Sequence, residues 1–196
     1  MELPYQDAVL DKYLQPITMI TFKPLGTTEI ELNELVKLGL KYDKRQKRQM
    51  LAAGKSSPPE KHQVTAFENA ICHPLPGDYR KFLLEKNGGI PSKSKVRTYD
   101  NMERIVQHLY ALTNQSKQFT IGHFLEVYRN RLPTTMLPIG DDPAGNLFLI
   151  GIADDQNYGK VFFWDHEQEA DMENQPYAKN ISIVAQSFSE FLNKLQ

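Results

Sequence analysis

Two short apolar runs in the last third of the chain indicate buried β-strands. One run covers residues 147–152 (LFLIGI), and the other covers residues 160–164 (KVFFW). Both are too short for a core helix and are rich in branched and aromatic side chains, which favours strands with two apolar faces. Such strands must lie inside a sheet and under at least one layer of helices. Asp141, Asp142 and Pro143, followed by Gly145 and Asn146, predict that a turn within residues 137–146 leads into the first strand.

Four stretches with apolar residues at helical spacing are expected to form amphipathic helices that cover this sheet. They span residues 75–83, 102–112, 121–132 and 188–195. Capping-box spacing, in Asp100 with Glu103 and in Ser187 with Glu190, marks the starts of the second and fourth helices. Residues 181–185 (ISIVA) alternate as a strand does. Because strands and helices do not alternate along the chain, the predicted class is α+β, with a mainly antiparallel β-sheet covered by several amphipathic helices.

Residues 1–66 have a different character and are predicted to be an N-terminal helical extension and linker, followed by the main domain at residues 67–196. A short helix near residues 9–14, a short strand at residues 17–22 and a longer helix that begins at Thr28 are expected. The second half of the longer helix, from Lys41 to Arg48, is strongly basic. This segment is either a solvated helix end or a contact for nucleic acid or an acidic partner. Residues 54–61 (GKSSPPEK) break the periodicity as a linker does.

The overall charge narrows the classes of function. The 196 residues include 23 basic and 24 acidic side chains, a net charge of −1, which argues against a general nucleic-acid or membrane-surface binder. The first residues lack the basic and apolar pattern of a signal peptide, and no apolar run is long enough to span a membrane. We therefore expect a cytoplasmic protein. Its single cysteine, Cys72, cannot form an internal disulfide.

The acidic residues are concentrated in the second part of the chain. Residues 67–196 hold 16 acidic and 13 basic residues, a net charge of −3, whereas residues 1–66 have a net charge of +2. Acidic groups on loops suit the binding of a basic protein partner, because opposite potentials accelerate encounter. An ordinary solubilising surface with turn-forming aspartates is the alternative interpretation. The candidate partner-binding residues are Asp141, Asp142, Asp154, Asp155, Asp165, Glu167 and Glu169.

No pattern in the sequence predicts a catalytic residue, a metal ligand or a cofactor. The five histidines are scattered, and the chain contains no HExxH, CxxC, GxSxG, Walker or GxGxxG motif. Asp165, His166 and Glu167 would suit a metal site or a proton relay if their side chains met. Neighbouring residues on a strand point to opposite faces of the sheet, which argues against such a site. Trp164 would be a partner anchor if it were exposed, but its apolar neighbours favour a place in the core.

Several motifs resemble the SUKH superfamily, of the Smi/Knr type. The resemblance covers roughly residues 67–196 and departs from the common pattern between Pro91 and Thr120. It rests on LPGDY at residues 75–79, NGG at 87–89, LPIGDD with Gly145-Asn146, GKVFFWDHE at 159–167 and the final helix. The motif residues expected to have structural roles are Leu75, Pro76, Asp78, Tyr79, Gly88, Gly89, Gly145, Asn146 and Trp164.

This resemblance implies a non-catalytic bacterial immunity protein. Members of the superfamily commonly bind a cognate toxin domain, often a nuclease, and neutralise it stoichiometrically in the cytoplasm. Fungal relatives instead act as regulatory scaffolds linked to cell-wall synthesis. A scaffold or regulatory module with partners other than a toxin is therefore the alternative function, because a shared fold does not determine a function.

Overall fold

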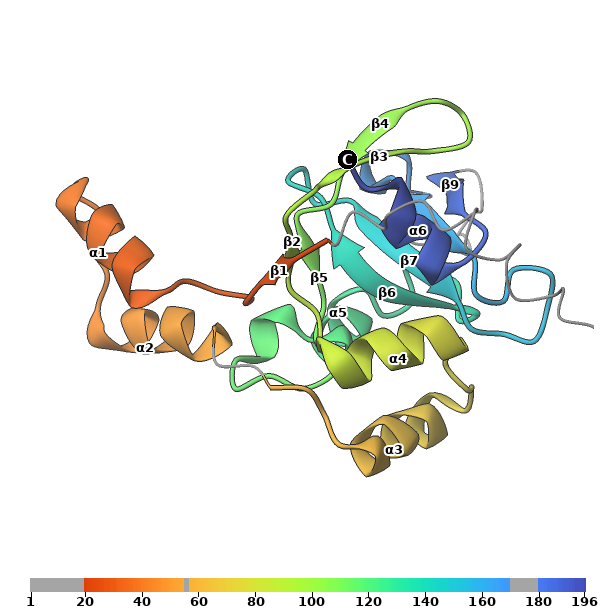
Figure 1. Cartoon of the computed structure of the whole chain (residues 1–196), viewed down its shortest axis with the longest axis horizontal. Coiled ribbons are helices and arrows are strands. Elements are labelled where there is room, and N and C mark those ends of the chain that lie inside the picture. The colour runs from red at the N-terminus through yellow and green to blue at the C-terminus, as the bar shows by residue number, and fades with distance from the viewer. Residues whose placement is uncertain (1–19, 55–56, 170–179) are drawn as a thin grey trace, which may run out of the picture.

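A five-stranded antiparallel sheet forms the centre of the protein (Figure 1). The computed structural model describes residues 20–54, 57–169 and 180–196. The strands of this sheet occur in the spatial order β5-β6-β7-β8-β9, so each strand pairs with its neighbour in sequence. Helices cover both faces, and the predicted α+β class is confirmed. The strands are β5 (His108–Leu109), β6 (Met136–Asp141), β7 (Leu147–Gly151), β8 (Val161–Trp164) and β9 (Ile181–Ala185).

The two central strands, β7 and β8, are buried along their whole length, as their apolar sequences predict. Side chains alternate between the two faces of a sheet. Phe148 and Phe163 lie opposite each other and share one face, where Phe148 also contacts Phe191. Leu147 and Trp164 form the next pair and therefore belong to the other face. Both faces of the sheet thus require an apolar cover.

Helices α4 (Gly77–Glu85) and α6 (Phe188–Lys194) cover the first face, and α5 (Ile121–Val127) covers the second. Tyr79 and Phe82 on α4 each place a ring 4.9 Å from the ring of Phe188 on α6. On the opposite face, Tyr128 at the end of α5 meets the edge of Trp164 at 5.5 Å between ring centroids. A further helix, α3 (Lys61–Ile71), packs against α4. The helices predicted at residues 75–83, 121–132 and 188–195 are confirmed, although α5 ends earlier than predicted.

The prediction of a helix at residues 102–112 is wrong, because this segment contains strand β4 (Glu103–Ile105) and strand β5. Strand β4 pairs with β3 (Lys95–Arg97) in a hairpin. Asp100 and Asn101 lie in its turn, where Asn101 has a φ of 65°, and the Asp100 carboxylate accepts hydrogen bonds from hydroxyl groups instead of capping a helix. Ile105 lies in β4 and Leu109 in β5, so the apolar residues at helical spacing do not share the face of one helix.

Two other boundaries differ from the prediction. Residues 136–141 form strand β6, so the turn before β7 is limited to residues 142–146. The longer helix near the N-terminus is two helices, α1 (Glu29–Lys37) and α2 (Lys44–Ala53). Thr28 and Glu31 form the predicted capping box of α1, whereas Asp43 caps α2 and so divides the basic segment from α1.

Residues 20–54, which we call the arm, extend from the sheet and its helices (Figure 1). The arm begins at β1 (Phe22–Lys23), which pairs with β2 (Ile90–Pro91). The helix predicted near residues 9–14 and most of the strand predicted at residues 17–22 lie outside the described residues. The predicted domain boundary between residues 66 and 67 falls within α3. The division into two domains stays a prediction.

Candidate partner-binding surface

The LPGDY motif holds two helices together. Leu75, Pro76 and Tyr79 are buried where α4 begins. One carboxylate oxygen of Asp78 accepts a hydrogen bond from the backbone N–H of Ser189 in α6 at 2.8 Å. Burial raises the pKa of the Tyr79 hydroxyl. The contacts of Leu75, Pro76, Asp78 and Tyr79 described here are all within the protein.

The NGG motif joins three segments of the chain. The side-chain amide of Asn87 donates to the carbonyl groups of Ser57 and Thr113 at 2.7 Å each, and its oxygen accepts from the N–H of Leu112 at 2.8 Å. Gly88 has a φ of +85°, and an added Cβ would lie 2.6 Å from the carbonyl oxygen of Leu109. Gly89 in turn exchanges two backbone hydrogen bonds with Leu109. A side chain at residue 88 would push this segment away from Leu109 on β5.

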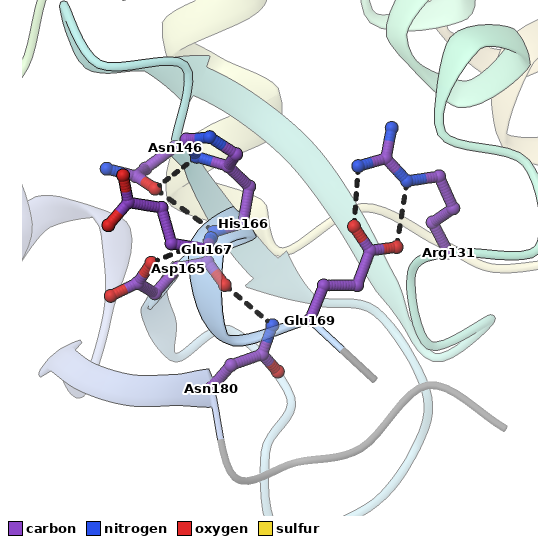
Figure 2. Close-up of polar contacts among 7 residues, drawn as sticks. All are labelled: Arg131, Asn146, Asp165, His166, Glu167, Glu169 and Asn180. Atoms are coloured by element: carbon purple, nitrogen blue, oxygen red, sulfur yellow. Dashed lines mark hydrogen bonds and ion pairs between the residues drawn. The ribbon is translucent and has the colours of Figure 1, made fainter. Parts of the chain in front are cut away.

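The turn between β6 and β7 is held by Asp142 and Asn146. Asp142 accepts hydrogen bonds from the backbone N–H groups of Ala144 and Asn146 and from the side-chain amide of Asn146, at 2.8–2.9 Å. Asn146 then accepts from the backbone N–H of His166 and lies 2.8 Å from its ring Nδ1 (Figure 2). Gly145 completes the turn with a φ of +90°. Asp142 is therefore a turn-forming residue.

Asp165 and Glu169 are also engaged within the protein. Asp165 caps the short 3-10 helix η3 (His166–Gln168) and shares backbone and side-chain hydrogen bonds with Asn180. Figure 2 shows Glu169 turned toward Arg131, with its two oxygens 2.8 and 2.5 Å from two guanidinium nitrogens. This contact raises the pKa of Arg131.

The guanidinium of Arg131 also packs against two aromatic rings at the edge of the core. Its guanidinium lies 4.6 Å above the ring of Tyr128 and 5.6 Å from the ring of Trp164. Trp164 itself is 1% exposed. It is a core residue, and the partner-anchor interpretation of Trp164 is wrong.

Asp141 faces inward at the end of β6. One of its oxygens lies 2.8 Å from Nδ1 of His108, and both side chains are largely buried. Tyr110 is fully buried beside them, and burial, followed by the negative charge of Asp141, raises the pKa of its hydroxyl. Asp141 therefore contributes to an internal polar contact.

The remaining candidates are exposed: Asp154 and Asp155 on the loop after β7, and Glu167 in η3. Asp155 accepts a hydrogen bond from the N–H of Asn157 and so helps to form its own loop. Within the part of the chain that the structure describes, the carboxylates of Asp154 and Glu167 make no hydrogen bond or ion pair. Asp154 follows the end of β7, and Glu167 follows the end of the antiparallel neighbour β8, so they lie at opposite ends of the sheet. The three exposed acidic residues thus lie on two separate surfaces.

The surface near Asp154 includes Tyr158 and Glu68, which belong to no motif in the sequence. Tyr158 is 39% exposed, and its pKa is raised by partial burial and by the charges of Glu68, Asp154 and Asp78. Glu68 is itself paired with Arg80 at 3.2 Å. These residues come from α3, α4 and the loop after β7. Nothing in their sequence spacing indicates that they meet. We call Asp154, Asp155 and Tyr158, with these neighbours, the Asp154 surface.

The described residues contain no group of three or more His, Cys, Asp or Glu side chains arranged to hold a metal ion.

An apolar pocket of about 300 Å³ opens between α5, the end of α3 and the start of β6, with Leu125, Leu132, Met136 and Ile152 in its lining. A shallower hollow near the end of α3 contains Glu68, Cys72 and His73. Among the residues described, no helix has the length and apolar character needed to cross a membrane.

Sequence comparisons agree with this geometry. A sequence profile of the SMI1 / KNR4 family (SUKH-1) matches residues 58–194. The chain is 28% identical over 152 residues to YokK, an SPbeta prophage-derived uncharacterized protein of Bacillus subtilis (strain 168), covering 68% of this chain and 72% of YokK. The profile begins just before α3 and ends within the last turn of α6, so it spans the sheet and its covering helices. The chain therefore belongs to the SMI1 / KNR4 family (SUKH-1).

Proposed function

We propose that this protein is a non-catalytic immunity protein that binds a cognate bacterial toxin domain in the cytoplasm and neutralises it by stoichiometric association. Family membership supports this function, and so does the prophage origin of a relative, since toxins and their inhibitors serve competition between bacteria and their genetic elements. The observation that carries the proposal is the division of the acidic residues. Most of them stabilise the fold, whereas Asp154 and Glu167 keep exposed carboxylates that the described residues do not engage.

Such carboxylates suit a basic partner, such as a nuclease domain. Exposed acidic groups accelerate the encounter with a basic surface and reject acidic proteins. The unengaged groups also require no rearrangement of the fold before they bind. In contrast, Asp142 and Glu169 would each have to give up internal hydrogen bonds to contact a partner.

The test uses separate charge reversals at the two ends of the sheet. Tagged wild-type protein, an Asp154→Lys/Asp155→Lys variant and a Glu167→Lys variant are used to capture partners at low salt. The candidate toxin is then co-expressed with each form. Glu85→Lys is the matched control, because Glu85 is exposed and lies at the other end of α4 from Asp78.

Immunity predicts one stoichiometric toxin partner, protection of the co-expressing cells, and loss of both with at least one reversal but not with the control. A toxin that binds equally to the wild type, the two reversal variants and the control would exclude the acidic surfaces as its binding site. Failure of the protein to protect cells from any captured partner would exclude the immunity function.

The position of the two acidic surfaces favours one second candidate, a scaffold or regulatory module. Surfaces at opposite ends of a sheet can bind two different proteins at once. A scaffold would capture several partners that are not toxins, and each reversal would remove a different set. Such a result would replace the immunity function.

A further inference from the structure

The arm makes few contacts with the rest of the protein. At its start, β1 pairs with β2. Near its end, the carbonyl of Ala53 accepts a hydrogen bond from the side chain of Asn114 at 3.1 Å, and α2 packs against the short helix η2 (Lys117–Phe119). Helix α1 lies beyond these contacts (Figure 1). The outer part of the arm is therefore held by α2 and not by the sheet or its covering helices.

Large apolar side chains are exposed on this outer part. Ile30 is 76% exposed and Leu38 is 79% exposed, and Val36 and Leu40 are also exposed. Within α1 itself, Leu32 is the buried residue. Single exposed apolar residues are ordinary, but four within eleven positions on a projecting element indicate a surface that another molecule covers.

The arm is also basic where the rest of the chain is acidic. Residues 20–54 contain seven basic and four acidic residues, a net charge of +3, whereas residues 67–196 have a net charge of −3. Lys37 is paired with Glu34. No other cation of the segment 37–48 has an ion pair within the described residues. These unpaired cations are Lys41, Lys44, Arg45, Lys47 and Arg48.

The Asp154 surface has the complementary character. It presents the exposed carboxylates of Asp154 and Asp155 beside the half-exposed ring of Tyr158. Asp78 on α4 lies nearby, whereas the charge of Glu68 is offset by its ion pair with Arg80. A surface that combines carboxylates with an aromatic ring matches an arm that combines cations with leucine and isoleucine side chains. Nucleic acid would match only the cations, and an anionic membrane would match the cations and the apolar side chains of the arm. Only a second copy of this chain also brings an acidic surface, the Asp154 surface, to pair with the arm.

We propose that the arm of one molecule docks on the Asp154 surface of a second copy of this chain, with Lys44, Arg45 and Arg48 facing Asp154 and Asp155. In Figure 1 the arm, in orange, extends from one side of the sheet, and the loop after β7, in light blue, lies toward the other. The arm therefore meets a different surface on the second copy, and the association is head-to-tail. Such a contact either closes, reciprocally in a dimer or in a larger ring, or continues as an open chain.

Sedimentation of the isolated wild-type protein, as a function of concentration and salt, measures this association without any other partner. We expect mass to increase with protein concentration, and the association to weaken strongly between about 20 and 500 mM salt, because exposed charges are screened. Neutralising the arm (Lys44→Gln/Arg45→Gln/Arg48→Gln) or the surface (Asp154→Asn/Asp155→Asn) should weaken association by about tenfold or more. Lys81→Gln/Lys86→Gln, in α4 and directly after it, is the control and should leave the association unchanged. Asn at residue 155 keeps an acceptor for the N–H of Asn157.

A mixture of the two neutralised variants gives the sharpest result. Each variant retains the half of the contact that the other lacks, so an equimolar mixture should form a 1:1 dimer that cannot grow further. A wild-type protein that stays monomeric at low salt and high concentration would overturn the proposal, and so would a mixture that forms no dimer. Binding of the monomer through its arm to a short DNA duplex or to anionic vesicles would assign the arm to that ligand instead. None of these outcomes depends on the toxin, so this proposal and the proposed function fail separately.

Discussion

Asp78, in the first turn of α4, accepts a hydrogen bond from the backbone N–H of Ser189, in the first turn of α6, at 2.8 Å. The two helices begin 111 residues apart in the chain and lie together on one face of the sheet. The first N–H groups of a helix have no partner within the helix. A carboxylate from one helix therefore completes the start of the other.

Replacing Asp78 with Ala should destabilise the protein by about 1–3 kcal/mol, because a charge-assisted hydrogen bond to a helix start is lost. Urea unfolding measures the change. Asp78→Asn keeps an acceptor oxygen and should cost less, and Glu85→Ala on the same helix is the control. Equal stability of the Ala and Asn variants would show that the contact to Ser189 contributes nothing.

Gly88→Ala should destabilise the protein by about 2 kcal/mol or more, because a side chain at positive φ is strained and its Cβ meets the Leu109 carbonyl. Gly122→Ala is the matched control. Gly122 lies in α5 with nothing within 4 Å of an added Cβ, so this change should be neutral or stabilising by about 0.5–1 kcal/mol. Thermal unfolding of both variants makes the comparison, and a tolerated Gly88→Ala change would contradict the tight approach at Leu109.

The pair of Arg131 and Glu169 should show a coupling free energy of about 1–2 kcal/mol in a double-mutant cycle, since its geometry is bidentate and both side chains are partly buried. The variants are Arg131→Met, Glu169→Gln and the two together. Trp164 lies beside the arginine, so its fluorescence should report loss of the guanidinium in the folded state. Additive single effects would place this pair among ordinary surface ion pairs.

Asp100 should make the stability of the protein depend on pH in the acidic range. Hydrogen bonds from the hydroxyl of Thr98 and then from Ser182 lower the pKa of Asp100 below its ordinary value of 3.8. Because the folded pKa is below the unfolded one, this group stabilises the fold above the unfolded pKa, and the contribution is lost as pH falls through the folded pKa.

Carbon NMR of the Asp100 carboxyl group measures its pKa directly. Ser182→Ala should raise the pKa of Asp100 slightly, and Thr98→Val should raise it further toward 3.8. The decline in stability between about pH 5 and pH 2 should be shallower in Thr98→Val than in the wild type. Titration of the wild-type group at or above its ordinary value would contradict this prediction.

The elements that the sequence predicted well are those with strong local signals. The apolar runs of β7 and β8, the capping box of Thr28 and the N-cap at Ser187 all correspond to observed elements. In these segments local preference and tertiary packing agree. Most of the central sheet and most of its covering helices were therefore predictable.

The segment around Asp100 shows why other parts were not. The spacing of its apolar residues fits a helix. In the structure, however, the Thr98 hydroxyl donates a hydrogen bond to the Asp100 carboxylate, and the backbone N–H of Tyr99 donates to the carbonyl of Ile183 on β9. These contacts with a strand more than eighty residues away decide the local structure. No window of sequence contains both partners.

The candidate surface shows the same limit. Sequence alone placed seven acidic residues on loops but treated them as one set. Strand direction separates Asp154 from Glu167, and internal partners remove Asp141, Asp142 and Glu169 from the exposed surface. Only the folded chain distinguishes a carboxylate that forms a turn from one that is free to bind.

Asn87 has a consequence for how the arm and the family fold are joined. Its side-chain amide donates a hydrogen bond to the backbone carbonyl of Ser57, three residues after the end of the arm. Asn87 thus holds the chain at Ser57 and not the arm itself. Removal of the arm would leave this bond in place, although it would take away the contact of Phe22 with Phe82. For protein engineering, a fragment that begins at residue 57 keeps this bond and all of α3, whereas one that begins at residue 67 loses both.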